Sequence, residues 1–346
     1  MAGRHAKRPR IRAVISLASP YRFRWDPPLE AVAALMRANW ARPCWEYSAS
    51  LLRYHVDKPS GGRRLSLGVE SELSGALVGY QAHIPLDIEL HGRHLRAVFA
   101  SFLTAAAETR GAAIALATQV QLLERAQECG FEVYLTMCEV GALSNMSVKR
   151  ACRAIARPLI TLRVTRYFAG ARPQVSARLT APSPRTRQFE ECDEAGVFEL
   201  LQQSGASIPL RQQHRREDVA HRFTSADNRR TFVFERGGRI VGVIHVLVLV
   251  VLDRVREYRN AYIQDLALDD LTPDERKAFV NDVLHHVTAL SIEAICVPDT
   301  GTFDAGLWKP LGFRLMPRAI NLYGVPLRQE RAAALANVAA FHLDVY

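Results

Sequence analysis

Apolar residues recur with helical spacing in some segments of the first half of the chain and with a strand-type pattern in others. Segment 26–40 has apolar side chains three or four positions apart after a Pro-Pro pair, which predicts a helix. Segment 45–62 ends in a Pro-Ser-Gly-Gly turn, and we expect a second helix before that turn. The stretches that follow are rich in strand-forming residues, are separated by Ser-Gly and His-Gly turns, and predict an antiparallel meander: 64–72, 75–92 and 94–104.

The rest of this half alternates between helix and strand. Segment 113–130 is alanine-rich with helical spacing and closes at Gly130, a residue suited to the position after a helix. Segment 131–137 predicts a buried strand. A helix over 144–156 then opens with Ser144 and Asn145, which are good N-cap residues, and 158–170 returns as a strand.

The second half repeats this order in weaker form. Helix patterns precede two strands that meet at a Gly-Gly turn, and a further strand leads to Thr272-Pro273 and Glu275, a helix start of the capping-box type. The tail, 328–343, predicts a final helix. We therefore expect four parts: a basic disordered leader at 1–12, a first domain at 13–170, a proline-rich linker at 171–187, and a second domain at 188–346 that includes the C-terminal helix.

The composition fits a globular protein of two ordinary domains. The chain has 346 residues, of which 49% are hydrophobic and 23% are charged, and this length is sufficient for two cores. Its longest apolar run, Val241–Leu252, is about half as long as a membrane-spanning helix and predicts a buried strand. No secretory signal pattern follows the basic N-terminus, so we expect no membrane span and a cytoplasmic location.

Charge and cysteine content narrow the possible partners only slightly. A net charge of +10 favours polyanions, but arginine is used heavily throughout the chain, so the charge alone predicts no dedicated nucleic-acid site. The cysteines are scattered, with no C-x-x-C pair and no histidine at zinc spacing, and they indicate neither a disulfide framework nor a metal site: Cys44, Cys129, Cys138, Cys152, Cys192 and Cys296.

The junction between 94–104 and 113–130 has the most specific pattern. It reads Glu-Thr-Arg-Gly-Ala-Ala-Ile-Ala, from Glu108 to Ala115. A glycine followed by small side chains at a helix start presents several backbone amides toward one point, and the helix dipole adds positive potential there. Such a loop can hold a diphosphate, with Arg110 as a charged contact; a simple helix cap is the alternative interpretation.

At this junction the chain resembles the GNAT superfamily of N-acetyltransferases, whose signature is Arg or Gln, two residues, Gly, one residue, and Gly or Ala. Arg110 and Ala115 match it, Gly111 is frequent in the family, and Ala113 stands where the family usually has Gly. The resemblance covers about residues 25–168 by motif and 190–326 by topology. It implies an α/β fold with a mixed sheet and two tandem GNAT-like acyl-CoA N-acyltransferase domains, similar to bacterial acyltransferase-like members found among polysaccharide-related genes.

The resemblance also implies where an acyl-CoA, acetyl-CoA or another, would bind. The strand before the junction would offer backbone groups to the pantetheine arm from Phe102, Leu103 and Thr104. The loop would hold the diphosphate through Arg110, Gly111, Ala112, Ala113, Ile114 and Ala115. Asn145 falls where the family has an Asn at a helix start. Many members have a tyrosine seven residues later that can protonate the leaving thiolate, and this chain has Cys152 there.

Catalytic groups are harder to assign from the sequence. Acyl transfer to an amine needs a deprotonated nucleophile, and Glu139, just past the predicted strand 131–137, is the candidate base, with an ordinary loop carboxylate as the alternative. Tyr134 and His83 fall on strand patterns and are interpreted as core or edge residues. Cys138 and Cys152 have no histidine that the sequence places beside them, which favours buried structural thiols over an acyl-enzyme.

The second half has acidic residues where the first half has its loop. They surround Pro273 at the predicted helix start: Asp269, Asp270, Asp274 and Glu275. Concentrated negative charge would repel a diphosphate, so we expect this half to have lost CoA binding. It would then either shape the acceptor pocket or act as a structural partner of the first half.

Three functions remain open. The leading hypothesis is an N-acyltransferase that moves an acyl group from acyl-CoA to a primary amine of a small molecule or an amino sugar, with its catalytic site in the first half. An aminoacyl-tRNA-dependent transferase of the peptidoglycan-crosslinking type would share the doubled fold and use the basic charge. A non-catalytic GNAT-like module that binds a metabolite or a partner protein is favoured by Ala113 and Cys152. The sequence does not disclose the acceptor, the acyl chain length or the oligomeric state.

Overall fold

The computed structural model describes residues 20–59, 65–109, 113–224, 226, 228–302, 304–331, 335 and 338–343. The predicted leader at 1–12 lies outside these ranges, and so do Arg110, Gly111 and Ala112 and most of the predicted Pro-Ser-Gly-Gly turn. Within the described ranges, no helix is long and apolar enough to cross a membrane.

The first half places helices on both faces of an antiparallel meander, in the order that the sequence predicts. The helix predicted over 26–40 forms and buries its apolar face. The elements are β1 (Tyr21–Trp25), α1 (Leu29–Asn39), β2 (Cys44–Trp45), α2 (Ala49–Val56), β3 (Leu65–Ser71), β4 (Leu77–Leu90), β5 (Arg93–Ala105), η1 (Ala107–Thr109), α3 (Ile114–Glu128), β6 (Val133–Glu139), α4 (Leu143–Ala154) and β7 (Ile160–Ala171).

The second half has the same order of elements with additional short segments. The apolar run Val241–Leu252 lies in β11, between β10 and β12, and is a buried strand as predicted. The elements are α5 (Arg172–Ser176), β8 (Thr186–Gln188), η2 (Glu191–Asp193), α6 (Glu194–Gln203), β9 (Leu210–Gln212), α7 (Arg216–Phe223), β10 (Arg229–Arg236), β11 (Arg239–Leu252), β12 (Glu257–Ala267), α8 (Pro273–Thr288), β13 (Ala294–Pro298), α9 (Ala305–Trp308), η3 (Lys309–Leu311), β14 (Arg314–Pro326), η4 (Gln329–Arg331) and β15 (Phe341–His342).

Two local predictions are wrong. Ser144 and Asn145 are not N-caps, because α4 begins at Leu143 after Ala142 and places both in its first turn. The tail has no α-helix among its described residues, because it forms η4 and β15, and Phe341 and Leu343 are buried in a core cluster. Segment 171–187 begins with α5, whose Val175 is fully buried, and ends in β8, and its role as a linker stays a prediction.

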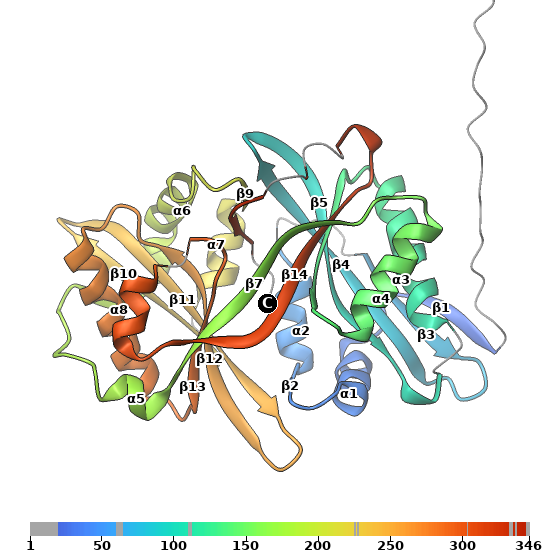
Figure 1. The fold of residues 1–346 in the computed structure, drawn as a ribbon, viewed down its shortest axis with the longest axis horizontal. Helices are drawn as coiled ribbons and strands as arrows, with labels where there is room; N and C mark the ends of the chain where they lie inside the picture. Colours follow the sequence, from blue (N-terminus) through green and yellow to red (C-terminus); the bar gives the residue numbers. More distant parts are fainter. Residues whose placement is uncertain are drawn as a thin grey trace, which may run out of the picture.

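In the described part of the chain, one mixed sheet of 15 strands runs through both halves, and the halves exchange strands (Figure 1). β14, from the end of the chain, lies between β6 and β7 of the first half and is antiparallel to both. β7 in turn pairs with β13 of the second half. Smaller contacts also cross, because β2 pairs with β11 and β9 pairs with β4. The halves therefore complete each other's sheet, and the division into separate domains stays a prediction.

The helices α1 and α2 belong to a core that both halves share. Leu52 and Tyr80 of the first half are buried in one cluster with Leu247 and Tyr262 of the second. At its edge, Trp45 Nε1 donates a hydrogen bond to the Tyr262 hydroxyl at 2.7 Å. The α1 and α2 layer thus lies between strands of the two halves.

Candidate functional site

The strands β5 and β6 run side by side only over the first part of β5. Residues 97–100 pair in parallel with 133–136, and past Ala100 no described strand pairs with this edge of β5. β6 pairs with β14 along its other edge over its whole length, Val133–Glu139. The last residues of β5 therefore have backbone groups that no neighbouring strand uses on that side.

β5 also has a bulge at this point. Its register against β4 runs from Ala82 opposite Ser101 to Tyr80 opposite Thr104, so Phe102 and Leu103 together face one residue, Gln81. Phe102 has a φ of +63°, a conformation that costs a residue with a side chain about 1–2 kcal/mol. Bulges of this kind turn groups out of a ladder and are frequent beside active sites.

The bulge changes the face on which the side chains of β5 pack. Ala100 lies in the core under α3 and α4, whereas Phe102 lies in the core of α1 and α2. The Phe102 ring centroid is 5.0 Å from that of Tyr47 and 6.0 Å from that of His55. The predicted pantetheine strand is therefore held by the aromatic side chains of the α1 and α2 layer.

The C-terminal end of α1 holds the end of β5. Trp40 Nε1 donates to Thr104 Oγ1 at 2.7 Å, and that hydroxyl donates to the carbonyl of Phe102 at 3.1 Å. Asn39 Oδ1 accepts from the Ala107 amide at 2.8 Å. The sequence does not point to this role of Asn39 and Trp40, because no local pattern connects them to residues so distant in the chain.

The start of α3 lies close to the sheet, and no described side chain caps it. Its N-cap, Ala113, has left-handed angles, with φ 55° and ψ 19°. A Cβ built on Gly79 of β4 would meet Ile114 Cγ2 at 2.5 Å, so only a glycine lets the helix start come this near. The first amides of a helix lack partners within the helix. Because Arg110, Gly111 and Ala112 lie outside the described residues, the loop itself stays a prediction.

The corresponding helix start in the second half is closed by its own side chains. Thr272 Oγ1 accepts from the Glu275 amide at 3.3 Å, and Glu275 Oε2 accepts from the Thr272 amide at 3.0 Å, which is the predicted capping box. Hydrogen bonding from the Thr272 backbone lowers the pKa of Glu275. Asp269 Oδ2 accepts from Ser204 Oγ at 2.7 Å. The Thr272 and Glu275 amides are therefore already hydrogen-bonded, and the loss of CoA binding in this half stays a prediction.

The predicted polar residues beyond β6 interact with other side chains of the protein. Glu139 is about half exposed, and its Oε1 lies 3.6 Å from Arg318 Nε. Asn145 is buried, and its Oδ1 accepts from the Tyr323 hydroxyl of β14 at 2.9 Å. The proposed roles of Glu139 and Asn145 stay predictions.

The cysteines near this end of β6 are in the core. Cys152 is fully buried, and burial raises its pKa to about 12. Burial also raises the pKa of Cys138. Both thiols are therefore protonated at neutral pH, which supports the interpretation as structural thiols.

Tyr134 and His83 are core residues, as the sequence predicts. Their rings lie 5.1 Å apart, and both side chains are buried. Neither ring nitrogen of His83 has a hydrogen-bond partner among the described residues, and burial lowers the pKa of His83 to about 3.

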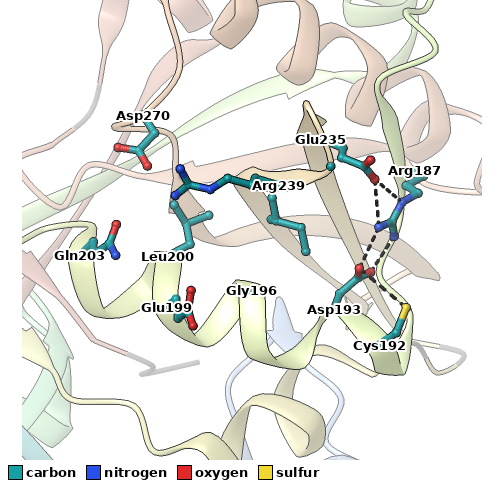
Figure 2. A pocket seen from close by; sticks show the side chains of 12 residues that line it. Arg187, Cys192, Asp193, Gly196, Glu199, Leu200, Gln203, Glu235, Arg239 and Asp270 are labelled. Carbon is teal, nitrogen blue, oxygen red and sulfur yellow. Dashed lines mark hydrogen bonds and ion pairs between the residues drawn. The ribbon is translucent and has the colours of Figure 1, made fainter.

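A pocket of about 270 Å³ lies elsewhere, on the second half, between α6 and the β10–β11 hairpin (Figure 2). Its Arg187 is already paired, with Nη1 2.6 Å from Asp193 Oδ2 and Nη2 3.3 Å from Glu235 Oε2. Figure 2 shows this triad on one side of the pocket and the Arg239 side chain extending toward Asp270 on the other side. None of the predicted site residues lines this pocket.

No protein-family model matches the sequence, and no curated protein sequence is similar to it. Solved structures are similar in fold. The N-myristoyltransferase of Saccharomyces cerevisiae with bound myristoyl-CoA superposes with a TM-score of 0.73 at 16% identity, over 90% of this chain and 83% of that one. A second structure of that enzyme, with myristoyl-CoA and inhibitors, has a TM-score of 0.74 at 16% identity, over 90% and 81% of the two chains.

The chain has the fold of N-myristoyltransferase. A conserved protein of unknown function from Enterococcus faecalis, a probable N-acyltransferase, is also similar, with a TM-score of 0.56 at 9% identity over 88% of this chain and 72% of that one. These similarities confirm the predicted α/β fold of two tandem GNAT-like domains. At such low identity they establish the fold alone.

Proposed function

We propose that the chain is an acyl-CoA-dependent N-acyltransferase whose first half binds the CoA part of the donor. One observation carries this proposal. Three features meet at one end of β5: the bulge at Phe102, the point where β5 leaves β6, and the start of α3, which no described side chain caps. The chain shares its fold with an enzyme whose solved structures contain myristoyl-CoA.

The residues at this end of β5 have complementary roles in the proposal. Backbone groups of Phe102, Leu103 and Thr104 would bind the pantetheine arm along the free edge of β5. The amides of Ile114 and Ala115, with those of the loop that contains Gly111, would bind the diphosphate at the start of α3. Asn39 and Trp40 would position the strand end through their bonds to Ala107 and Thr104.

In the proposed reaction the amine nitrogen attacks the thioester carbonyl, the carbon–sulfur bond breaks, and the amide and free CoA are released. The amine must lose a proton and the thiolate must gain one. Glu139 remains the candidate base, and it would have to leave Arg318 to accept the proton. Cys152 is too deeply buried to serve as the acid. The acyl group, acetyl or longer, and the acceptor amine remain open.

Ligand-induced stabilisation tests the proposal. Acetyl-CoA and myristoyl-CoA are each added to the full chain, and unfolding is followed by fluorescence. A bound donor at about a hundred times its Kd adds about 2.7 kcal/mol to the free energy of unfolding and raises Tm. We expect Gly111→Val to abolish this shift, because a branched side chain would crowd the amides, while Asp274→Val, in the first turn of α8, leaves it unchanged. An unchanged Tm with both donors in the wild type would remove the proposal.

The second candidate function is ligand binding without turnover. Two observations favour it. Glu139, the candidate base, is paired with Arg318, and Cys152, at the position of the proton donor in the resembled family, is buried. Assay of free CoA release over a broad panel of primary amines separates the two functions. The aminoacyl-tRNA alternative stays a prediction, and tRNA binding with a steep salt dependence in the absence of CoA binding would support it.

A further inference from the structure

The helix α4 differs from the other described helices in what it exposes. Among them, only α4 has large apolar side chains that face the solvent: Leu143 is 78% exposed and Met146 is 51% exposed. Val140, in the turn just before the helix, is 52% exposed. Single exposed apolar residues are common on protein surfaces, but a group of them marks a surface that contacts another molecule or a membrane.

The exposed residues of α4 form one stripe along the helix. They follow one another at intervals of three, four and three residues, which places them on one side: Leu143, Met146, Arg150 and Arg153. The opposite side is buried: Asn145, Val148, Ala151 and Cys152. Asn145 accepts a hydrogen bond from Tyr323 of β14, so the stripe points away from the sheet. It is apolar at the start of the helix and basic toward its end.

The charge of this stripe is not balanced within the protein. α4 contains no acidic residue. Lys149 is also exposed, and neither Lys149 nor Arg150 nor Arg153 forms an ion pair with a described residue. The carboxylate just before the turn, Glu139, already pairs with Arg318. A surface that joins unpaired basic groups to exposed apolar ones is complementary to an anionic lipid surface.

The start of β14 brings further exposed apolar residues near this turn. The Val140 amide donates to the Ala319 carbonyl at 2.9 Å, which holds the turn against β14. Leu315 and Met316, shortly before Arg318 in β14, are also exposed. Figure 1 shows α4 and β14 next to each other. The apolar end of the stripe is therefore continued by a second segment of the chain.

We propose that the stripe of α4, together with Val140, docks on an anionic membrane surface. Leu143 and Met146 would enter the headgroup region, and Arg150 and Arg153 would bind lipid phosphates, for which the guanidinium group is well suited. A membrane fits better than an acidic protein, because lipid adapts to side chains that project from a helix, whereas a protein would need a matching pocket. This role goes beyond the proposed acyl transfer and does not depend on it.

Vesicle cosedimentation tests this surface with the full chain. Vesicles of phosphatidylcholine mixed with phosphatidylglycerol are compared with vesicles of phosphatidylcholine alone. We expect binding to the anionic vesicles that weakens as salt is added. Arg150→Gln with Arg153→Gln should weaken binding about 25-fold, because each basic residue beside an anionic membrane contributes about fivefold. Leu143→Ser with Met146→Ser should weaken it about tenfold, since two apolar side chains no longer enter the lipid.

Matched controls replace residues of the same kind elsewhere on the surface. Leu73→Ser with Val255→Ser removes two exposed apolar side chains in other turns, and Arg239→Gln with Arg254→Gln removes two exposed arginines of the second half. Both pairs should leave binding unchanged. All the replaced residues are exposed, so we expect every variant to keep the wild-type Tm, and Tm is measured for each.

Several outcomes would overturn the proposal. The basic residues of the first 12 positions are kept in every variant, so binding that survives in both α4 variants would place the contact elsewhere. Equal binding to neutral vesicles, no binding to anionic ones, or equal losses in the controls would also refute it. Binding of polyglutamate without binding of anionic vesicles would assign the stripe to an acidic protein instead. Failure of the CoA experiment would leave these results unaffected.

Discussion

Ala113 has a backbone conformation that suits glycine better than alanine. In the sequence, Ala113 stands where the signature that the junction resembles usually has glycine, but the sequence does not show the backbone angle. The structure gives a φ of 55°, in the left-handed region. An alanine there is therefore strained, whereas helical angles would have made the substitution harmless.

We expect Ala113→Gly to raise the free energy of unfolding by about 1 kcal/mol, because glycine adopts left-handed angles without a Cβ clash. Urea unfolding measures the change. Ala142→Gly is the matched control, since Ala142 is also an uncapped N-cap, of α4, but has a φ of −68°. The control should lower stability slightly. Equal changes in the two variants would show that left-handed strain at Ala113 contributes nothing.

His83 is a second residue whose surroundings are unfavourable. Its ring is fully buried against Tyr134, and burial holds its pKa at about 3. In the unfolded chain a histidine has a pKa of about 6.5. Below that pH the unfolded state binds more protons than the folded state, so acid destabilises the fold through this residue.

Above about pH 6.5, protonation of His83 therefore does not affect stability. As pH falls from about 6.5 toward 3, the free energy of unfolding decreases by about 1.4 kcal/mol per pH unit because of this residue. His83→Leu removes this slope. When pH is lowered from about 7.5 to about 5, we expect the free energy of unfolding of the variant, measured in urea, to rise by about 2 kcal/mol relative to that of the wild type. His94→Leu, at an exposed position of β5, should leave the pH dependence unchanged. Parallel curves for His83→Leu and wild type would refute the assignment.

At the scale of the elements, the start of α3 depends on a contact that the sequence pattern does not show. Gly79 is the third residue of β4, and a glycine within a strand usually weakens the sheet. Its role is to let Ile114 approach β4, since a Cβ there would lie 2.5 Å from Ile114 Cγ2 and 3.2 Å from Val69 Cβ. The position of α3, and with it the proposed diphosphate site, depends on this close approach.

Gly79→Ala should lower the free energy of unfolding by about 1–3 kcal/mol, as overpacking does, and should also reduce the stabilisation by an acyl-CoA. Both effects appear in the same thermal unfolding experiment with and without donor. Gly196→Ala, in α6, tests a glycine replacement in a helix, and its stability should stay within about 1 kcal/mol of wild type. A Gly79→Ala protein with wild-type stability would show that Ile114 can move away at no cost.

The elements differ in how well local pattern predicts them. The capping box of α8 is visible in the sequence and is confirmed, because all its hydrogen bonds are between neighbours in the chain. The bulge at Phe102 is not visible in the sequence, because a bulge is a property of two strands and their register. The tail was predicted to be helical, but pairing of β15 with β9 and burial of Phe341 and Leu343 give it another conformation.

At the scale of the whole molecule, the exchange of strands makes each half dependent on the other. β14 fills the place between β6 and β7, and without it both strands would have open edges. The core around α1 and α2 contains Leu247 and Leu249 of the second half. Folding of the first half therefore requires residues from the last part of the chain.

We expect the full chain to unfold in one cooperative transition, in contrast to two independent domains, because the sheet is continuous across the halves. Scanning calorimetry would give a calorimetric enthalpy equal to the van't Hoff enthalpy. Leu322→Ala in β14, at a fully buried position, should lower the single Tm by removing packing from the shared strand. Two resolved transitions, with only one shifted by Leu322→Ala, would contradict this interpretation.

The sequence by itself determined the order of helices and strands, the buried strand at Val241–Leu252, the capping box of α8 and the place of the small-residue junction at 108–115. These features depend on periodicity and on hydrogen bonds between near neighbours, which a linear pattern records. Tertiary structure alone decided the insertion of β14 between β6 and β7, the left-handed angle of Ala113 and the support of β5 by Trp40. Each of these depends on contacts between residues far apart in the chain, and local propensity contains no information about such contacts.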